Sequence, residues 1–145
     1  MNDRLLRHFG VGQLYLLEVE SDAVKALAVN AEAVAACRIA WAEAHAALSR
    51  RAREVPADAP SIRQAKQALA ADWPHYLIVD VTQAVVARAG DFADTFALRG
   101  YDSVQLAAAY EAKQVSELPL TFACFDSRLN KAAQVLGMEA PFAVI

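Results

Sequence analysis

Apolar residues recur every three or four positions along most of the chain, the spacing that places them on one face of a helix. Three residues fit helix ends: Ser61 and Thr82 are expected N-caps, and Gly137 is an expected C-terminal stop. Together the spacing and these signals predict helices over residues 14–30, 38–53, 61–73, 82–96, 102–114 and 127–136.

Short apolar runs with few charges predict strands between these helices. Residues 76–81 and 120–125 are apolar enough for strands buried on both faces, and residues 142–145 predict a short final strand. Residues 33–37 are either a buried strand or the start of a helix, because the run is too short to decide. Strands that alternate with helices predict an α/β fold, with a parallel sheet covered by helices on both sides.

Composition narrows the class of protein. A chain of 145 residues, 57% hydrophobic and 21% charged, predicts a single globular domain over residues 1–145. The net charge of -3 provides no overall basic field for nucleic acid, so any RNA contact needs a local patch or metal ions. Cys37 and Cys124 lie in apolar runs and are expected to be buried thiols. With no signal peptide and no membrane-spanning apolar run, we expect a cytoplasmic protein without membrane association.

Glu43 is unusual because it falls on the apolar stripe of its helix, four residues after Ile39. A carboxylate directed at a core is unfavourable unless it is paired or binds a metal. Partial exposure, or an ion pair with Arg50 or Arg51, explains Glu43 equally well. The basic run at the end of this helix is either a solvated helix end or a contact for RNA phosphates.

Two further acids stand at expected helix starts. Asp102 follows a break at Gly100, and Asp126 follows a predicted strand directly. Either carboxylate is explained by acceptance of backbone N–H groups at a helix N-terminus. Each also fits a metal ligand, because ligands of parallel α/β sheets bind beyond the carboxyl ends of the strands.

The strings around these acids resemble one family. Residues 98–109 (LRGYDSVQLAAA) resemble the "LRxxDAxHLAxA" signature of PIN-domain ribonucleases of the VapC toxin type, with Ser103 and Gln105 where the family often has Ala and His. Residues 126–137 (DSRLNKAAQVLG) resemble the family's "fDxrLxxAAxxLG" segment. Residues 42–48 (AEAHAAL) resemble the helix that carries the family's Glu.

The resemblance implies a three-layer α/β/α PIN-like domain with a central parallel sheet. It implies a homodimeric endoribonuclease that depends on Mg²⁺ (or Mn²⁺) and is inhibited by a cognate antitoxin. Glu43, Asp102 and Asp126 would be its catalytic and metal-binding residues, since hard cations prefer oxygen ligands. One such ion activates a water, and a second about 3.5–4 Å away stabilises the leaving oxygen.

The N-terminus departs from the family, which opens with a strand ending in Asp-Thr-Ser, then Ala-Leu-Val-Lys-Leu-Tyr. The match begins only at Leu14, and Arg7 falls where the metal-binding Asp is expected. Residues 7–13 can be encoded as CGA CAC TTC GGC GTT GGT CAA, which one base later reads Asp-Thr-Ser-Ala-Leu-Val. We therefore hypothesise a frameshift over residues 1–13, and we expect this divergent segment to be disordered and a poor central strand.

Two alternatives to an active ribonuclease stay open. One is a catalytically impaired PIN domain that only binds antitoxin or RNA, because the first acid is missing. The other is an unrelated α/β binding module in which Glu43, Asp102 and Asp126 are caps and ion pairs. The ribonuclease and the impaired domain require the three carboxylates to converge, whereas the binding module leaves them scattered.

Overall fold

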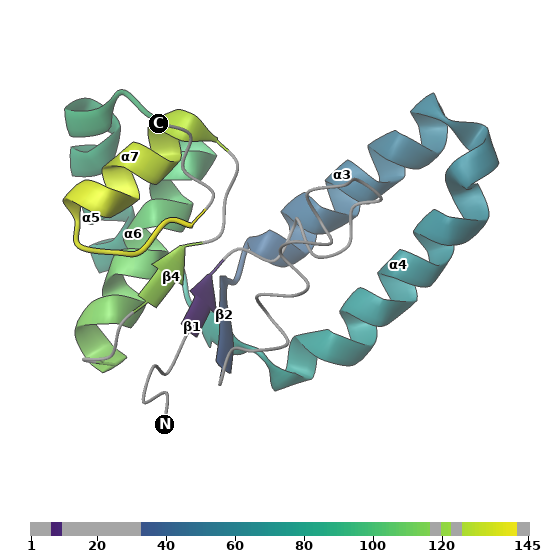
Figure 1. Ribbon diagram of the computed structural model, residues 1–145, viewed down its shortest axis with the longest axis horizontal. Helices are drawn as coiled ribbons and strands as arrows, with labels where there is room; N and C mark the ends of the chain where they lie inside the picture. The colour runs from purple at the N-terminus through teal and green to yellow at the C-terminus, as the bar shows by residue number, and fades with distance from the viewer. Residues whose placement is uncertain (1–6, 10–32, 117–119, 123–125, 142–145) are drawn as a thin grey trace.

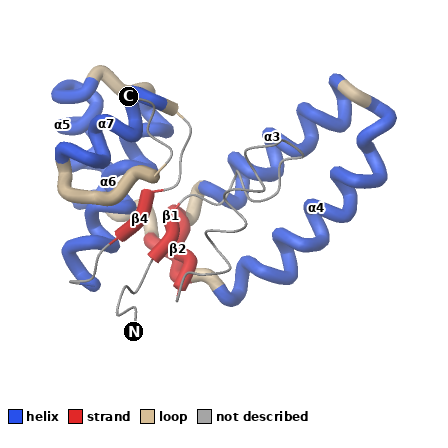
Figure 2. Tube along the Cα trace, viewed as in Figure 1, coloured by secondary structure: helices blue, strands red, loops and turns tan. Residues whose placement is uncertain are grey.

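The computed structural model describes residues 7–9, 33–116, 120–122 and 126–141, and shows a small sheet between two groups of helices (Figures 1 and 2). The strands are β1 (Arg7–Phe9), β2 (Ala33–Cys37), β3 (Leu77–Val79) and β4 (Leu120–Phe122). The helices are α3 (Ala40–Glu54), α4 (Ala59–Asp72), α5 (Gln83–Phe96), α6 (Gly100–Ser116) and α7 (Ser127–Val135), with 3-10 turns η1 (Pro56–Asp58) and η2 (Trp73–His75). None of the helices in the described ranges combines the length and apolarity that crossing a bilayer requires.

The sheet has the order β3-β2-β1-β4, and every neighbouring pair is parallel. The predicted parallel α/β arrangement is therefore confirmed, and residues 33–37 are a strand rather than a helix start. The expectation that the N-terminal segment makes a poor central strand is wrong for β1, which pairs with β2 and β4. Pairing on both sides satisfies its backbone groups whatever the side chains are. The helix predicted over 14–30, the strand predicted over 142–145 and residues 123–125 lie outside the described residues.

Helices cover both faces of the sheet because successive side chains of a strand point to opposite sides. Ala35 and Cys37 of β2 pack with α5, α6 and α7, whereas Ala36 between them packs with α3 and α4. Cys37 is a free, buried thiol as expected, and burial raises its pKa; Cys124 lies outside the described residues. The helical hairpin of α3 and α4 projects away from the sheet, and α5, α6 and α7 form the other group (Figure 1).

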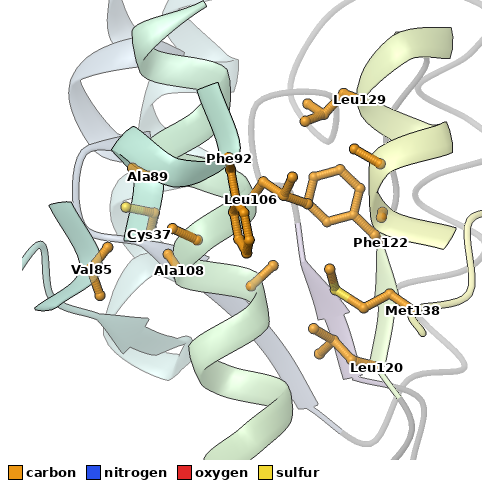
Figure 3. Packing of buried hydrophobic residues seen from close by; sticks show 14 of the residues in the cluster. Cys37, Val85, Ala89, Phe92, Leu106, Ala108, Leu120, Phe122, Leu129 and Met138 are labelled. Atoms are coloured by element: carbon orange, nitrogen blue, oxygen red, sulfur yellow. The ribbon is translucent and has the colours of Figure 1, made fainter. Parts of the chain in front are cut away.

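Helix α6 is the centre of the larger core. Its residues Leu106, Ala107, Ala108 and Ala109 are all 0% exposed, which means that α6 is surrounded on every side. Leu106 and Phe122 lie together in this core, with Met138 close by (Figure 3). The packing fixes the position of α6, and with it the side chains of its first turns.

Two of the three helix-end residues predicted from the sequence, Thr82 and Gly137, are confirmed. Thr82 Oγ1 accepts a hydrogen bond of 3.2 Å from the Val85 N–H, and Gly137 follows α7 with a φ of 85°. Ser61 is not an N-cap, because α4 begins at Ala59. Pro60 lacks an N–H and has a φ suited to a first helical turn, so the helix starts before this residue.

Strand β3 corrects a second expectation. The apolar run over 76–81 was predicted to be buried on both faces, but Leu77 is 47% exposed. The reason is the position of β3 at the end of the sheet order, next to β2. The apolar content of residues 76–81 therefore predicts the strand correctly, but the prediction that this strand is buried on both faces is wrong.

Candidate functional site

The three predicted acids lie at helix starts near one edge of the sheet. Glu43 is in the first turn of α3, which follows β2, and Asp126 directly precedes α7, which follows β4. Parallel strands end at a common edge, where α/β proteins bind their ligands. Asp102 comes from the first turn of α6, the helix packed against β2 and β4.

Glu43 is partly buried and is held by a residue from another helix. Its Oε2 accepts a hydrogen bond from Gln105 Nε2, and its Oε1 is buried without a hydrogen-bond partner among the described residues. The alternative of an ion pair with Arg50 or Arg51 is wrong within the described ranges. Arg51 instead donates from Nε to Asp58 Oδ2 at 3.2 Å. Glu43 therefore points toward α6 rather than toward the basic end of its own helix.

The pKa of the Glu43 carboxyl is raised, first because burial disfavours its charged form. The hydrogen bond from Gln105 lowers this pKa, and the negative charge of Asp102 raises it. Glu43 and Asp102 are thus close enough for one charge to act on the other, although 59 positions separate them in the chain (102 − 43).

Asp102 lies within the first turn of α6 rather than at its N-cap. Arg99 has the cap position, since its carbonyl accepts the hydrogen bond from the Ser103 N–H at 2.9 Å. Burial raises the pKa of Asp102, the charge of Asp126 raises it further, and the charge of Arg99 lowers it. The charge of Asp102 thus affects the pKa of Glu43, and the charge of Asp126 affects the pKa of Asp102.

Asp126 is an N-cap, as the cap interpretation predicted. Its Oδ1 accepts a hydrogen bond of 2.9 Å from the Leu129 N–H, and its backbone is extended before α7 begins. Asp126 can cap α7 and also take part in a site. The hydrogen bond from Leu129 fixes the orientation of its carboxylate, and the charge of that carboxylate acts on Asp102.

A polar cavity of about 370 Å³ lies between the starts of α6 and α7. Both aspartates line it, and two arginines line it with them. The lining residues are Ala97, Leu98, Arg99, Asp102, Asp126, Ser127 and Arg128.

The donor chemistry of the three acids fits a hard divalent cation. Carboxylate oxygens are the ligands that Mg²⁺ and Mn²⁺ prefer, and the buried Oε1 of Glu43 has no hydrogen-bond donor among the described residues. A cation would also relieve the mutual repulsion that raises the pKa values of Glu43 and Asp102. Within the described ranges, no three His, Cys, Asp or Glu side chains lie close enough together to share one ion.

Sequence reasoning missed the role of Gln105. In the sequence it is a departure from the signature, where His is more common, and it lies one turn after Asp102 on the same helix face. Its hydrogen bond joins α6 to α3, and such a long-range contact has no local signal in a single sequence.

Comparisons with known proteins add relatives and a structural neighbour, whereas no family model matches the chain. Two Mycobacterium tuberculosis proteins, Ribonuclease VapC45 of strain CDC 1551 and Ribonuclease VapC49 of strain H37Rv, are each 31% identical over 125 residues. The alignment covers 86% of this chain and 85% of either relative. A toxin-antitoxin complex from Klebsiella pneumoniae contains a chain of similar fold, with a TM-score of 0.61 and 18% identity over 95% of this chain and 99% of that one.

Proposed function

The chain belongs to the VapC family of ribonucleases, and from this premise we propose that it is an endoribonuclease toxin of a toxin-antitoxin pair. It hydrolyses RNA phosphodiester bonds in a Mg²⁺-dependent (or Mn²⁺-dependent) reaction at Glu43, Asp102 and Asp126. The helices on both faces of the parallel sheet support the proposal of a three-layer α/β/α PIN-like domain.

The observation that carries this proposal is that Asp102 and Asp126, from the starts of α6 and α7, line one polar cavity. The charge of Asp102 acts on Glu43, and the charge of Asp126 acts on Asp102. The shared cavity and these charge effects favour an acidic site over an unrelated binding module, in which the three side chains would be scattered caps and ion pairs. Within the described ranges the three acids are too far apart to share one ion, so the proposal takes them as neighbours in pairs. Glu43 and Asp102 are partly buried and each is influenced by another carboxylate, which is unfavourable without a cation and supports a cation-binding role.

The metal, when bound by these carboxylates, supplies an activated water and a positive charge at the departing oxygen. The chain's own residues prepare the site. Gln105 holds Glu43 through Oε2, and the Leu129 N–H holds Asp126 through Oδ1. Asp102 lies in the first turn of α6, whose buried middle fixes the position of the helix backbone. Two of the three carboxylates are therefore oriented by hydrogen bonds before substrate arrives.

We propose three further properties on the basis of the family and of the neighbour in a toxin-antitoxin complex. The protein forms a homodimer, it acts on RNA in the cytoplasm, and a cognate antitoxin inhibits it. The antitoxin segment lies across or near the acidic site.

The proposal is tested by RNA cleavage with purified full-length protein, with Mg²⁺ or with EDTA. Asp102→Asn removes the central charge with little change of shape, and we expect at least about a 100-fold loss of rate. Asp94→Asn is the matched control, because Asp94 is an exposed aspartate on α5 outside the cavity. Cleavage that survives EDTA, or an Asp102→Asn rate equal to that of Asp94→Asn, contradicts the proposal.

A second candidate function is a catalytically impaired PIN domain that only binds antitoxin or RNA. The specific observation in its favour is β1, whose sequence is Arg-His-Phe and contains no carboxylate. Metal-dependent cleavage at the rate of an intact relative rules this candidate out. Binding without any cleavage supports it.

A further inference from the structure

We propose that Arg99 and Arg128 form a binding site for a phosphate group of single-stranded RNA, a proposal that rests on the ribonuclease function above. Both arginines line the cavity of about 370 Å³ that Asp102 and Asp126 also line. The cavity therefore combines two guanidinium groups with two carboxylates, rather than being acidic alone. This combination suits a phosphodiester, whose anionic oxygens need cationic partners beside any metal-binding carboxylates.

Arg99 is placed by the start of α6. It holds the N-cap position, so its backbone is fixed by the helix while its side chain is exposed. Arg99 lines the same cavity as Asp102, so the arginine and that carboxylate share one polar space. Among the described residues Arg99 forms no ion pair, and its donors are therefore available to an anionic ligand.

Arg128 is placed from the opposite side of the cavity by α7. Its Nη1 donates a hydrogen bond of 3.0 Å to the carbonyl oxygen of Ala97, at the end of α5. Ala97 has a left-handed backbone with a φ of 54°, an uncommon conformation for a residue with a side chain. The bond uses one of the five N–H groups of the guanidinium, so the group is oriented while other donors stay available.

The helix starts add to the positive character of the cavity. Helices α6 and α7 both begin at its walls, and the N-terminal end of a helix carries a partial positive charge that favours phosphate. The whole chain has a net charge of -3, so affinity for RNA must come from such a local arrangement. A planar guanidinium matches the geometry of phosphate oxygens better than a lysine ammonium does.

The test is the binding of a fluorescein-labelled single-stranded oligoribonucleotide to the full chain in EDTA, which prevents metal-dependent cleavage. Fluorescence anisotropy gives the Kd at several salt concentrations between about 50 and about 200 mM. We expect Arg99→Gln and Arg128→Gln each to raise the Kd about tenfold. Each should also reduce the salt slope of log K by about 0.7, the value for one lost phosphate contact on a single strand. Arg63→Gln, an exposed arginine on α4, is the matched control and should change neither quantity.

Arg128→Gln also removes the bond to Ala97, so Arg128→Lys provides a variant that keeps the charge. A salt slope that stays at the wild-type value in Arg99→Gln overturns the proposal, since Arg99 forms no ion pair with any described residue whose loss would disturb the fold. Absence of RNA binding by the wild type also overturns it, as does tighter binding of an oligoglutamate peptide than of RNA. If binding depends on the arginines but the wild type never cleaves RNA, the proposed function fails and this site stands. If cleavage is normal in both Gln variants, the site fails and the function stands.

Discussion

Gln105 on α6 donates its side-chain N–H to Glu43 on α3, a hydrogen bond between residues 62 positions apart. The bond accounts for only one oxygen of a partly buried carboxylate, and the other has no hydrogen-bond partner among the described residues. It also connects the two groups of helices on either side of the sheet at the position of the proposed metal site. Gln105 therefore acts as a positioning residue for Glu43.

Replacement of Gln105 by Ala should weaken metal binding more than it weakens the fold. Residues that orient a metal ligand from behind typically contribute about 10–100-fold to metal affinity or activity. We expect Gln105→Ala to raise the Mn²⁺ dissociation constant by about tenfold, measured by electron paramagnetic resonance of the free ion. Gln105→His keeps a side-chain N–H donor and should recover most of the affinity.

Gln114→Ala is the control for this prediction. Gln114 is an exposed glutamine on the same helix, and its Nε2 donates a hydrogen bond within that helix, to Tyr110 Oη at 2.9 Å. Equal Mn²⁺ affinities for the Gln105→Ala and Gln114→Ala proteins would contradict a positioning role for Gln105.

Asp126 allows its cap and its proposed catalytic role to be separated. Asn is about as good an N-cap as Asp, whereas Ala cannot accept the Leu129 N–H. We expect Asp126→Asn to keep the free energy of unfolding within about 1 kcal/mol while RNA cleavage falls at least about 100-fold. Asp126→Ala should lose cleavage to the same extent and about 1 kcal/mol of stability in addition.

Urea unfolding and RNA cleavage, measured on the same preparations, check this prediction. If Asp126 is a cap and nothing more, Asp126→Asn will cleave RNA at the wild-type rate.

The raised pKa values of Glu43 and Asp102 predict how stability depends on pH without metal. Their ordinary values are 4.5 and 3.8, and burial followed by a neighbouring carboxylate raises both in the folded protein. Between the ordinary and the raised values, the folded state binds more protons than the unfolded state. These two groups therefore make stability fall as the pH rises through that window, opposite to the usual carboxylate.

Thermal unfolding in EDTA from acid to neutral pH measures this effect. Asp102→Asn should raise the Tm at neutral pH relative to the wild type, and the difference should shrink as the pH falls. The exposed Asp94→Asn gives the baseline. A Tm for Asp102→Asn below that of Asp94→Asn at neutral pH would show that the charge of Asp102 stabilises the metal-free fold.

Local features of this fold could be predicted from the sequence because their causes are local. Thr82 and Asp126 act as caps through residues three positions away, and the apolar run of β2 forms a strand. Expectations that depended on position in the sheet were less successful, since the exposure of Leu77 follows from the strand order rather than from the run itself.

In the candidate site too, single residues could be predicted from the sequence, whereas contacts between distant residues could not. Glu43 stood out because a carboxylate on an apolar stripe needs a reason, but its partner could not be found, because Gln105 is brought to it only by the packing of α6. The arginines of the cavity belong to strings that resemble the family signatures, yet their common location depends on α6 and α7 starting side by side at one cavity. Strand β1 formed against expectation, since its neighbours on both sides satisfy the backbone.

Activity should be limited by the N-terminal segment. β1 contains Arg7 where the resemblance expects the first acidic ligand, and this strand lies between β2 and β4 in the middle of the sheet. A missing catalytic charge costs about 100-fold or more in rate. We expect replacement of residues 7–13 by Asp-Thr-Ser-Ala-Leu-Val-Lys to raise Mg²⁺-dependent RNA cleavage at least about 100-fold. The same replacement with Asn in the first position restores the apolar strand without the carboxylate and should give no increase. Equal rates for the Asp and Asn versions would place the defect in the strand rather than in the missing charge.

The coding DNA tests the origin of the segment independently, since codons for residues 7–13 that do not yield Asp-Thr-Ser one base later exclude a frameshift.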